Sequence, residues 1–141
     1  AGRARADGAE FAVDSRLGNW GLRAAASFLD TRNEDSGEPL RLSPKHQLAF
    51  GVSHLSGSSA DGWVKEALVT RWSPFFDRNP ATGSLVELRP WTTLDLGVRS
   101  TGPGDWEIKF GVLNLFDEAR ELTLDYPEPQ RRVYASLLHS Y

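Results

Sequence analysis

The sequence contains neither cysteine nor methionine among its 141 residues. The absence of cysteine excludes a disulfide framework and any thiol chemistry. The absence of methionine means that residue 1 is not a native start, so we expect a mature product or a fragment of a longer chain. Nucleic acid is not expected as a partner, because the formal net charge is −3 and proteins that bind nucleic acid usually carry basic patches.

Long apolar runs are also missing. No stretch approaches the ~20 apolar residues that a transmembrane helix needs, and no basic segment followed by an apolar one marks a signal peptide. The mean hydropathy of −0.41 is typical of a soluble protein. Transmembrane β-barrels have similar values, because only alternate residues meet lipid and the loops are polar. Hydropathy therefore leaves that class open.

Residue constellations that carry catalysis or metal binding are absent as well. The three histidines, His46, His54 and His139, fall on separate expected strands or strand ends, and without cysteine a zinc site is not expected. No glycine-rich phosphate loop occurs, and no serine has the context of a nucleophile elbow. We expect no enzymatic activity, no cofactor and no metal site.

One acidic loop leaves calcium binding open. It combines four carboxylates with an amide: Asp30, Asn33, Asp35, Glu34 and Glu38. Calcium prefers such oxygen ligands, but the spacing is not that of an EF-hand. A solvated acidic loop is the simpler interpretation.

The sequence does have a strong alternation of apolar and polar residues, which is typical of strands with two different faces. Seven segments show it and none shows a helical period. The expected strands are 10–16, 20–29, 46–55, 63–72, 91–99, 106–112 and 131–141. Residues 1–8 are interpreted as a leading segment without regular structure, and 84–88 as a possible extension of the fifth strand.

The connections between these strands alternate in length. Short turns follow the first, third and fifth strands (17–20, 56–62 and 100–105), and long loops follow the others (30–45, 73–90 and 118–130). We therefore predict an all-β fold, an antiparallel up-and-down meander of about seven strands. Outer-membrane barrels collect short turns at one end and long loops at the other. Bacterial barrels have an even strand number, so this sheet is expected to be part of a larger transmembrane barrel.

Tryptophans mark the strand ends. Trp20, Trp63 and Trp106 each begin a strand after a short turn, 43 residues apart in both intervals. Trp72 and Trp91 flank a long loop at the opposite end. Two such rows are typical of the aromatic girdles at membrane interfaces. The alternative is that these rings close the ends of a soluble core.

The two faces of the expected sheet differ in charge. One is almost purely apolar, with Glu66 as its expected exception. The other carries mixed charges, which suit either a wet barrel lumen or the solvated face of a half-buried sheet. Alternation alone does not separate these two possibilities.

The last third of the chain carries short motifs in a fixed order. Asn114-Leu115-Phe116-Asp117 follows the sixth strand, and Tyr126-Pro127-Glu128-Pro129 precedes Arg131 and a last strand that ends on Tyr141. This layout resembles the C-terminal end of a TonB-dependent outer-membrane receptor. Gln130 stands where that family usually has glycine, and His139 where it usually has an aromatic or apolar residue.

The resemblance implies a function. Such receptors lie in the bacterial outer membrane, surrounded by its lipid, and bind a scarce small molecule such as an iron-siderophore complex or cobalamin. Import uses energy from the TonB complex of the inner membrane. Residues 1–141 are then the C-terminal segment of the barrel domain, with the plug domain absent, and we expect that this chain alone does not transport.

Loop residues are the candidates for ligand contact, because loops on a rigid scaffold often carry function. They are Phe75, Phe76, Asp77, Arg78 and Tyr126. Packing within the loops is the equal alternative for each. Two other classes remain open: an outer-membrane barrel without a plug, structural or enzymatic, and a soluble β-protein that binds a small ligand.

Overall fold

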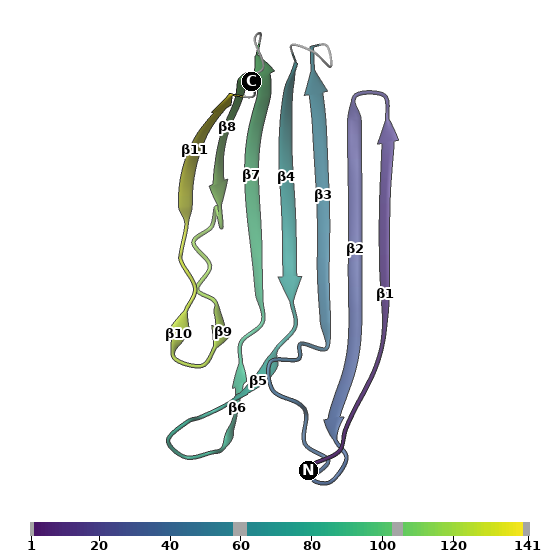
Figure 1. The fold of residues 1–141 in the computed structure, drawn as a ribbon, viewed down its shortest axis with the longest axis vertical. Helices are drawn as coiled ribbons and strands as arrows, with labels where there is room; N and C mark the ends of the chain where they lie inside the picture. The colour runs from purple at the N-terminus through teal and green to yellow at the C-terminus, as the bar shows by residue number, and fades with distance from the viewer. Residues whose placement is uncertain (1, 58–61, 103–105, 140–141) are drawn as a thin grey trace.

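The computed structural model describes residues 2–57, 62–102 and 106–139 and is built on one long antiparallel sheet (Figure 1). Seven strands lie in the order β1-β2-β3-β4-β7-β8-β11, so each long strand pairs with the next long strand along the chain. This confirms the predicted meander. The strands are β1 (Ala4–Leu17), β2 (Trp20–Asn33), β3 (His46–Ser56), β4 (Trp63–Trp72), β7 (Trp91–Gly102), β8 (Trp106–Leu113) and β11 (Arg132–His139).

Short turns and long loops lie at opposite ends of the sheet (Figure 1). The turn between β1 and β2 has only two residues, and Gly18 adopts the positive φ of 59° that such a hairpin requires. The turns after β3 and β7 include 58–61 and 103–105, which lie outside the described residues, as does Tyr141. Within the parts of the chain that the structure describes, no helix could cross a membrane.

The long loops contain two small hairpins. They are β5 (Phe75–Arg78) with β6 (Leu85–Leu88), and β9 (Glu121–Thr123) with β10 (Tyr126–Pro127). The expectation that 84–88 lengthens the following strand is therefore wrong. Pro90 explains the break, because proline has no N–H to donate to a ladder, and β6 pairs with β5 instead.

The first strand begins earlier than the sequence indicated. Residues 4–8 are not a leading segment, because Ala4 already pairs with Asn33 and β2 correspondingly extends into the expected loop. Gly8 explains how the strands approach here: a Cβ at this position would lie 2.6 Å from the backbone oxygen of Phe28. The strand depends on its partner rather than on its own alternation.

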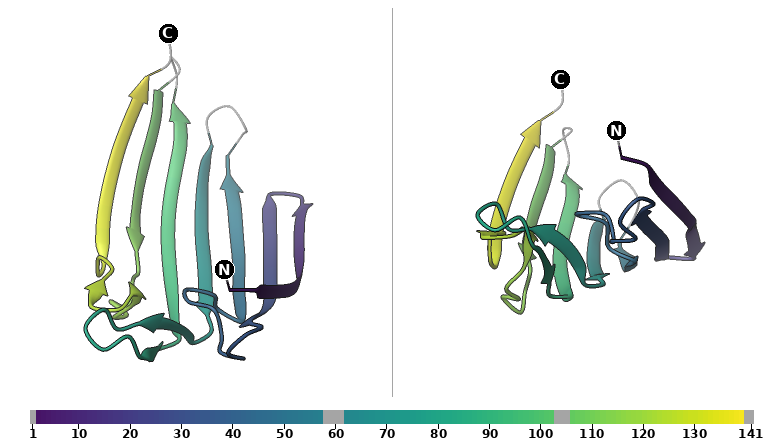
Figure 2. Two further views of the ribbon diagram at one scale, coloured as in Figure 1. Left: turned by 60° about the horizontal axis from the view of Figure 1, so that its bottom comes forward. Right: turned by 90° about the horizontal axis from the view of Figure 1, so that it is seen from below.

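The sheet is curved and open. Seen along its strands, it follows an arc from β1 to β11 with the loop hairpins at one end (Figure 2). The buried apolar side chains among the described residues are Phe75, Leu88 and Trp91, all at the long-loop end. The compact core thus lies under the loops, whereas most of the sheet leaves one face uncovered.

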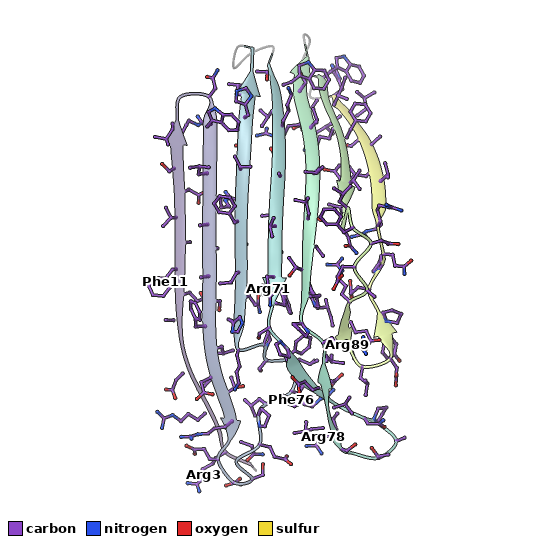
Figure 3. All side chains as sticks on the ribbon, turned by 180° about the vertical axis from the view of Figure 1, so that it is seen from behind. Arg3, Phe11, Arg71, Phe76, Arg78 and Arg89 are labelled. Atoms are coloured by element: carbon purple, nitrogen blue, oxygen red, sulfur yellow. The ribbon has the colours of Figure 1, made fainter. Side chains whose placement is uncertain are left out.

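Strand register defines two faces, since directly opposed residues of an antiparallel pair point to the same side. The apolar face carries side chains such as Val52, Val69, Leu96 and Phe110. Phe11, labelled in Figure 3, lies on the same face. The polar face carries Arg23, Ser53, Glu66, Arg99 and Lys109. Residues of the polar face line a hollow of about 540 Å³, so the sheet curves towards that side.

The faces of β4 are the reverse of the expectation. Glu66 lies on the polar face, opposite Ser53 and Gly97 in the register, and its carboxylate is 2.9 Å from Arg99 Nε. Lys65 and Arg71 lie on the apolar face instead. The sequence of β4 misleads because it mixes apolar and charged residues on both sides, and only the neighbouring strands decide its orientation.

Candidate functional site

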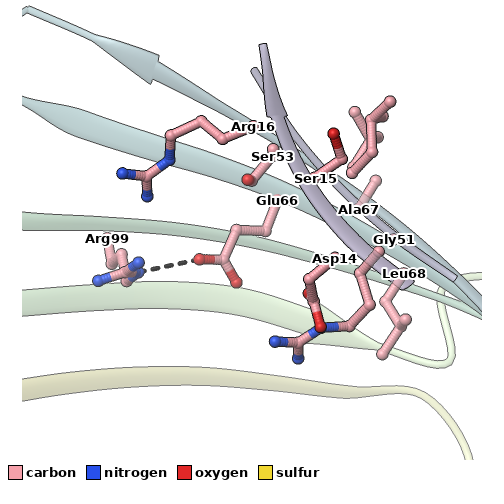
Figure 4. Close-up of a pocket in the computed structure, with 13 residues that line it drawn as sticks. Asp14, Ser15, Arg16, Gly51, Ser53, Glu66, Ala67, Leu68 and Arg99 are labelled. Atoms are coloured by element: carbon pink, nitrogen blue, oxygen red, sulfur yellow. Dashed lines mark hydrogen bonds and ion pairs between the residues drawn. The ribbon is translucent and has the colours of Figure 1, made fainter. Parts of the chain in front are cut away.

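Ion pairs line the hollow of the polar face near the short-turn end (Figure 4). Arg23 Nε is 2.8 Å from Asp14 Oδ1, and Arg99 Nε is 2.9 Å from Glu66 Oε1. About half or more of each of these four side chains is exposed. Exposed pairs of this kind contribute at most about 1 kcal/mol. Their effect is to make this wall hydrophilic rather than to hold the fold together.

Tyr134 lies across two glycines on the same face. A Cβ on Gly111 would approach the ring and hydroxyl of Tyr134 to 2.5 Å, whereas one on Gly97 would stay 3.5 Å from the hydroxyl. Gly111 on β8 thus leaves room for the ring of Tyr134, whose hydroxyl extends towards Gly97 on β7. The polar face therefore carries an aromatic side chain over β7, β8 and β11.

An aromatic cluster occupies the other end of the polar face. Trp72 and Trp91 are opposite in the register and stack with ring centroids 5.0 Å apart. Phe75 meets Trp72 edge-on at 6.0 Å, and the Arg120 guanidinium carbon lies 5.3 Å from the Trp91 ring centroid. The structure therefore contradicts a second outward girdle row for these two tryptophans. They point into the polar side, and Trp91 is only 5% exposed.

Two donors in this cluster lack partners. The indole Nε1 of Trp91 and Nε of Arg120 are buried without a hydrogen-bond partner among the described residues. Buried polar groups are usually paired, and each exception calls for an explanation. Both groups are donors, so an acceptor that reached the cluster from the polar side of the sheet would satisfy them.

Asp77 ties three loops together. Its carboxylate accepts hydrogen bonds from the backbone N–H groups of Leu124 (3.0 Å) and Arg78 (2.7 Å), and from Arg41 Nε (2.8 Å). Arg41 Nη2 also lies 2.7 Å from it. The Leu124 N–H contributes most to holding the pKa of the Asp77 carboxyl below its ordinary value, and the Arg78 N–H and Arg41 act in the same direction against burial. The ionised form thus suits this position.

The five loop candidates divide into two groups. Phe75 and Asp77 are enclosed and serve the packing of the loops. Phe76 is half-buried, Arg78 is exposed with Nη2 3.7 Å from Glu38, and Tyr126 is 72% exposed. Only the second group reaches the surface of the long loops.

Other residues of this site were missed from the sequence. Arg41 and Arg120 give no local signal, because their partners lie far away along the chain. The stacking of Trp72 on Trp91 did have a signal. Two tryptophans that flank one loop between neighbouring strands must meet on the same face when they are opposed in the register.

The motif from Asn114 to Asp117 forms a turn. The Asn114 amide accepts a hydrogen bond from the Glu118 N–H at 3.0 Å and donates to the Glu118 carbonyl at 2.9 Å, while its own N–H donates to Asp95 at 2.7 Å. Asp117 accepts the Arg131 N–H at 2.7 Å. Asn114 and Asp117 both have positive φ. The motif therefore fixes how the chain leaves β8 and where it enters β11.

The remaining three tryptophans, Trp20, Trp63 and Trp106, lie on the apolar face and are offset along the strands by the same number of residues. Register aligns Trp20 with Lys65 on β4, and Trp63 lies two residues nearer to the short turn. It also aligns Trp63 with Ile108 on β8, and Trp106 again lies two residues nearer to the turn. The offset is one residue per strand in both cases. Barrel strands are tilted and staggered by a constant shear, so this offset suits three rings at one height.

The acidic loop does not gather into a metal site. Asn33 accepts backbone N–H groups from Asp35 and Ser36, and Asp35 accepts the backbone N–H of Arg3. Across the described ranges, no group of three or more His, Asp or Glu side chains is placed to hold a metal ion.

Comparison with known families gives one sequence match. A profile of the β-barrel of TonB-dependent receptors, described as TonB dependent receptor-like, beta-barrel, matches residues 1–115. The matched range ends before Phe116, so the motifs at 126–131 lie beyond it. A search of curated proteins gives no significant match.

Solved structures with the same fold include an uptake receptor and a transporter. The ferric yersiniabactin uptake receptor FyuA from Yersinia pestis matches 98% of this chain at a TM-score of 0.74 and 17% identity. The copper transporter OprC matches 95% at 0.79 and 21% identity, and P. aeruginosa FpvA bound to heterologous pyoverdines matches 95% at 0.76 and 17% identity. The chain spans 22%, 23% and 19% of their lengths. At these identities the likeness shows the fold alone.

Proposed function

Because the chain belongs to the TonB-dependent receptors, as part of their β-barrel, we propose that it is a wall segment of a receptor that takes up a scarce ligand. The observation that carries the proposal is the division of one curved sheet into an apolar face and a charged, hollowed face. A barrel in lipid needs this division, since its outside meets hydrocarbon and its inside is polar.

The proposed setting is the bacterial outer membrane. Trp20, Trp63 and Trp106 lie at the interface on the side of the short turns, which face the periplasm in such barrels. Lipid covers the apolar face, and the hollow opens into the lumen. The segment acts by binding and enclosing, with no catalytic group and no cofactor of its own.

The proposed ligand is an acceptor-rich metal chelate, such as an iron-siderophore complex, or cobalamin. The unpaired donors of Trp91 and Arg120 support this, because they point to a ligand with exposed oxygen acceptors. Phe76, Arg78 and Tyr126 are the proposed contacts at the loop surface. In this proposal, the ligand first contacts the loop residues and then reaches the cluster of Trp72, Trp91 and Arg120.

Energy for uptake is proposed to come from the inner-membrane TonB complex. We propose that the segment belongs to the C-terminal part of the barrel. The turn at 114–117 and the approach at 126–131, which resemble the family's motifs in their order, support this assignment. We propose that TonB contacts other parts of the receptor and that the energy for uptake is transmitted through those parts.

Uptake by the full-length receptor tests the proposal. Cells that express it are given radiolabelled ferric pyoverdine, ferric yersiniabactin or cobalamin, with TonB present or deleted. We expect accumulation of at least one of these ligands only where TonB is present. Equal accumulation in both strains, or none of the three, contradicts the proposal for this ligand class.

A second test concerns the aromatic cluster. Trp91→Phe keeps a ring against Trp72 but removes the unpaired N–H. We expect the full-length receptor to bind the transported chelate about tenfold more weakly, as the loss of a hydrogen bond to a charged group implies. Trp63→Phe on the apolar face is the matched control and should leave affinity unchanged. Equal affinities of the Trp91 variant and wild type contradict the assignment.

A further inference from the structure

Two basic side chains meet on the apolar face near the short turns. His54 and Lys65 are directly opposed in the register of β3 and β4. The His54 ring lies 4.5 Å from that of Trp20, and its Nδ1 is 3.2 Å from the Ser56 hydroxyl. Nε2 of His54 and the ammonium of Lys65 make no hydrogen bond or ion pair with the described residues.

Lys65 lies slightly below the row of tryptophans. It is two residues farther from the turn than Trp63, or about 6.6 Å along an extended strand. A lysine at this depth keeps its charge in water or at headgroups by extending its stem along the surface. The ammonium is thereby brought back to the level of the indole rings.

Lys65 has no counter-ion in the part of the chain that the structure describes. Lys65 is exposed and has no ion pair among the described residues. The neighbouring carboxylate of Glu66 points to the opposite face and is committed to Arg99. The half of the apolar face next to the short turns carries no carboxylate within the described strands. An anionic group that is not among the described residues would neutralise this charge.

We propose that Lys65 and His54 bind the phosphate of an anionic glycerophospholipid, with Trp20 and Trp63 packing against its glycerol and upper acyl chains. The inference rests on the proposed function, which places this face in lipid. The short-turn end faces the periplasm in such barrels, where the leaflet is phospholipid. Charge complementarity selects an anionic headgroup, because the Lys65 ammonium favours a net negative ligand and His54 can donate a hydrogen bond to a phosphate oxygen.

Lipid retention by the full-length receptor tests this site. The purified protein in detergent is titrated with palmitoyl-oleoyl phosphatidylglycerol or the matching phosphatidylethanolamine, and bound lipids are counted by native mass spectrometry. We expect the wild type to prefer phosphatidylglycerol. Lys65→Gln should weaken its binding about fivefold, the effect of one basic residue near a charged headgroup, and Lys65→Arg should retain it.

Arg71→Gln provides the matched control. Arg71 lies on the same strand and face but near the long loops, where its Nη1 is 3.2 Å from Thr92 Oγ1 (Figure 3). Unchanged phosphatidylglycerol binding by Lys65→Gln, or an equal loss with Arg71→Gln, overturns the site.

Heat-modifiable migration on gels verifies that each variant is a folded barrel. Outer-membrane fractionation and ligand uptake of the wild type report on the proposed function separately, so a fractionating, transporting receptor without lipid preference overturns the lipid site alone.

Discussion

Tyr134 illustrates how single residues shape the inner wall. Its ring fits here because residue 111 is glycine: a Cβ at this position would lie 2.5 Å from ring atoms of Tyr134. We expect Gly111→Ala to lower the free energy of unfolding of the full-length receptor by about 1–3 kcal/mol, the usual range for overpacking. Urea unfolding in lipid vesicles measures this.

The matched control is Gly97→Ala on the adjacent strand. Its Cβ would lie at an ordinary contact distance of 3.5 Å from the Tyr134 hydroxyl, so stability should hardly change. A Tyr134→Ser background should remove most of the difference between the two glycine variants. Equal losses for both alanines in the wild-type background contradict the role given to the ring.

Asp77 is the residue on which loop order depends. We expect Asp77→Asn to increase amide hydrogen exchange about tenfold in peptides covering 36–44 and 119–129 at pH 7, since hydrogen bonds to a charged group are lost. Glu87→Gln, on the same hairpin and exposed, should leave exchange unchanged. Unaltered amide hydrogen exchange in the Asp77→Asn variant would contradict the role of Asp77 in holding these loops together.

The pH dependence of these loops follows from the same carboxyl. Its folded pKa is below the ordinary value, so its stabilisation is fully present above the unfolded pKa of about 4 and is lost as pH falls below it. Loop exchange of the wild type, corrected for intrinsic rates, should approach that of Asp77→Asn only in acid. A transition between pH 5 and 8 would contradict this assignment.

At the scale of the element, the turn after β8 explains why its sequence is so specific. Asn114 combines two hydrogen bonds to Glu118 with a φ of 53°. We expect Asn114→Ala to destabilise the barrel by about 2–4 kcal/mol through lost hydrogen bonds and backbone strain. Asn114→Gly should cost about 1 kcal/mol less because glycine adopts this φ freely.

Phe116 serves as the control within the motif, since it is 74% exposed. Phe116→Ala should change the unfolding free energy by less than about 1 kcal/mol. The three variants are compared by the same urea unfolding measurement. Equal effects of Asn114→Ala and Asn114→Gly would show that strain contributes nothing at this turn.

Elements were predictable from the sequence to the extent that their signal is local. Alternation identified all seven long strands, and the lengths of the connections identified the meander. The sequence did not predict the early start of β1 or the pairing of β6 with β5, because both depend on partners outside the segment itself. The face of β4 escaped for the same reason, and its correction is what brings Lys65 to the apolar side.

The candidate site was predictable only in part. Its position in the long loops followed from the layout of the strands, but the enclosure of Phe75 and Asp77 did not. The donors Arg41 and Arg120 come from other loops and have no periodic signal. Loop contacts are set by the packed arrangement rather than by neighbouring residues in the sequence.

At the scale of the whole molecule, the resemblance to TonB-dependent receptors is confirmed by the match over residues 1–115 and by the shared fold. The alternative of a soluble β-protein is thereby set aside. The exposed apolar face also agrees with the barrel, because a soluble sheet would need a second layer to cover it. In the proposed membrane setting, the backbone groups along the edges of β1 and β11 need hydrogen-bond partners.

The central claim, that this sheet separates lipid from lumen, is tested most directly by an accessibility scan along β3. This segment has no native cysteine, so single cysteines at each position from 47 to 53 of a cysteine-free full-length receptor can carry a nitroxide label in outer-membrane lipid. We predict that collisions with oxygen, which concentrates in hydrocarbon, peak at Leu48, Phe50 and Val52 and fall at the positions between them. A profile without this two-residue period, or with its maxima at Gln47, Ala49 and Gly51, would contradict the account.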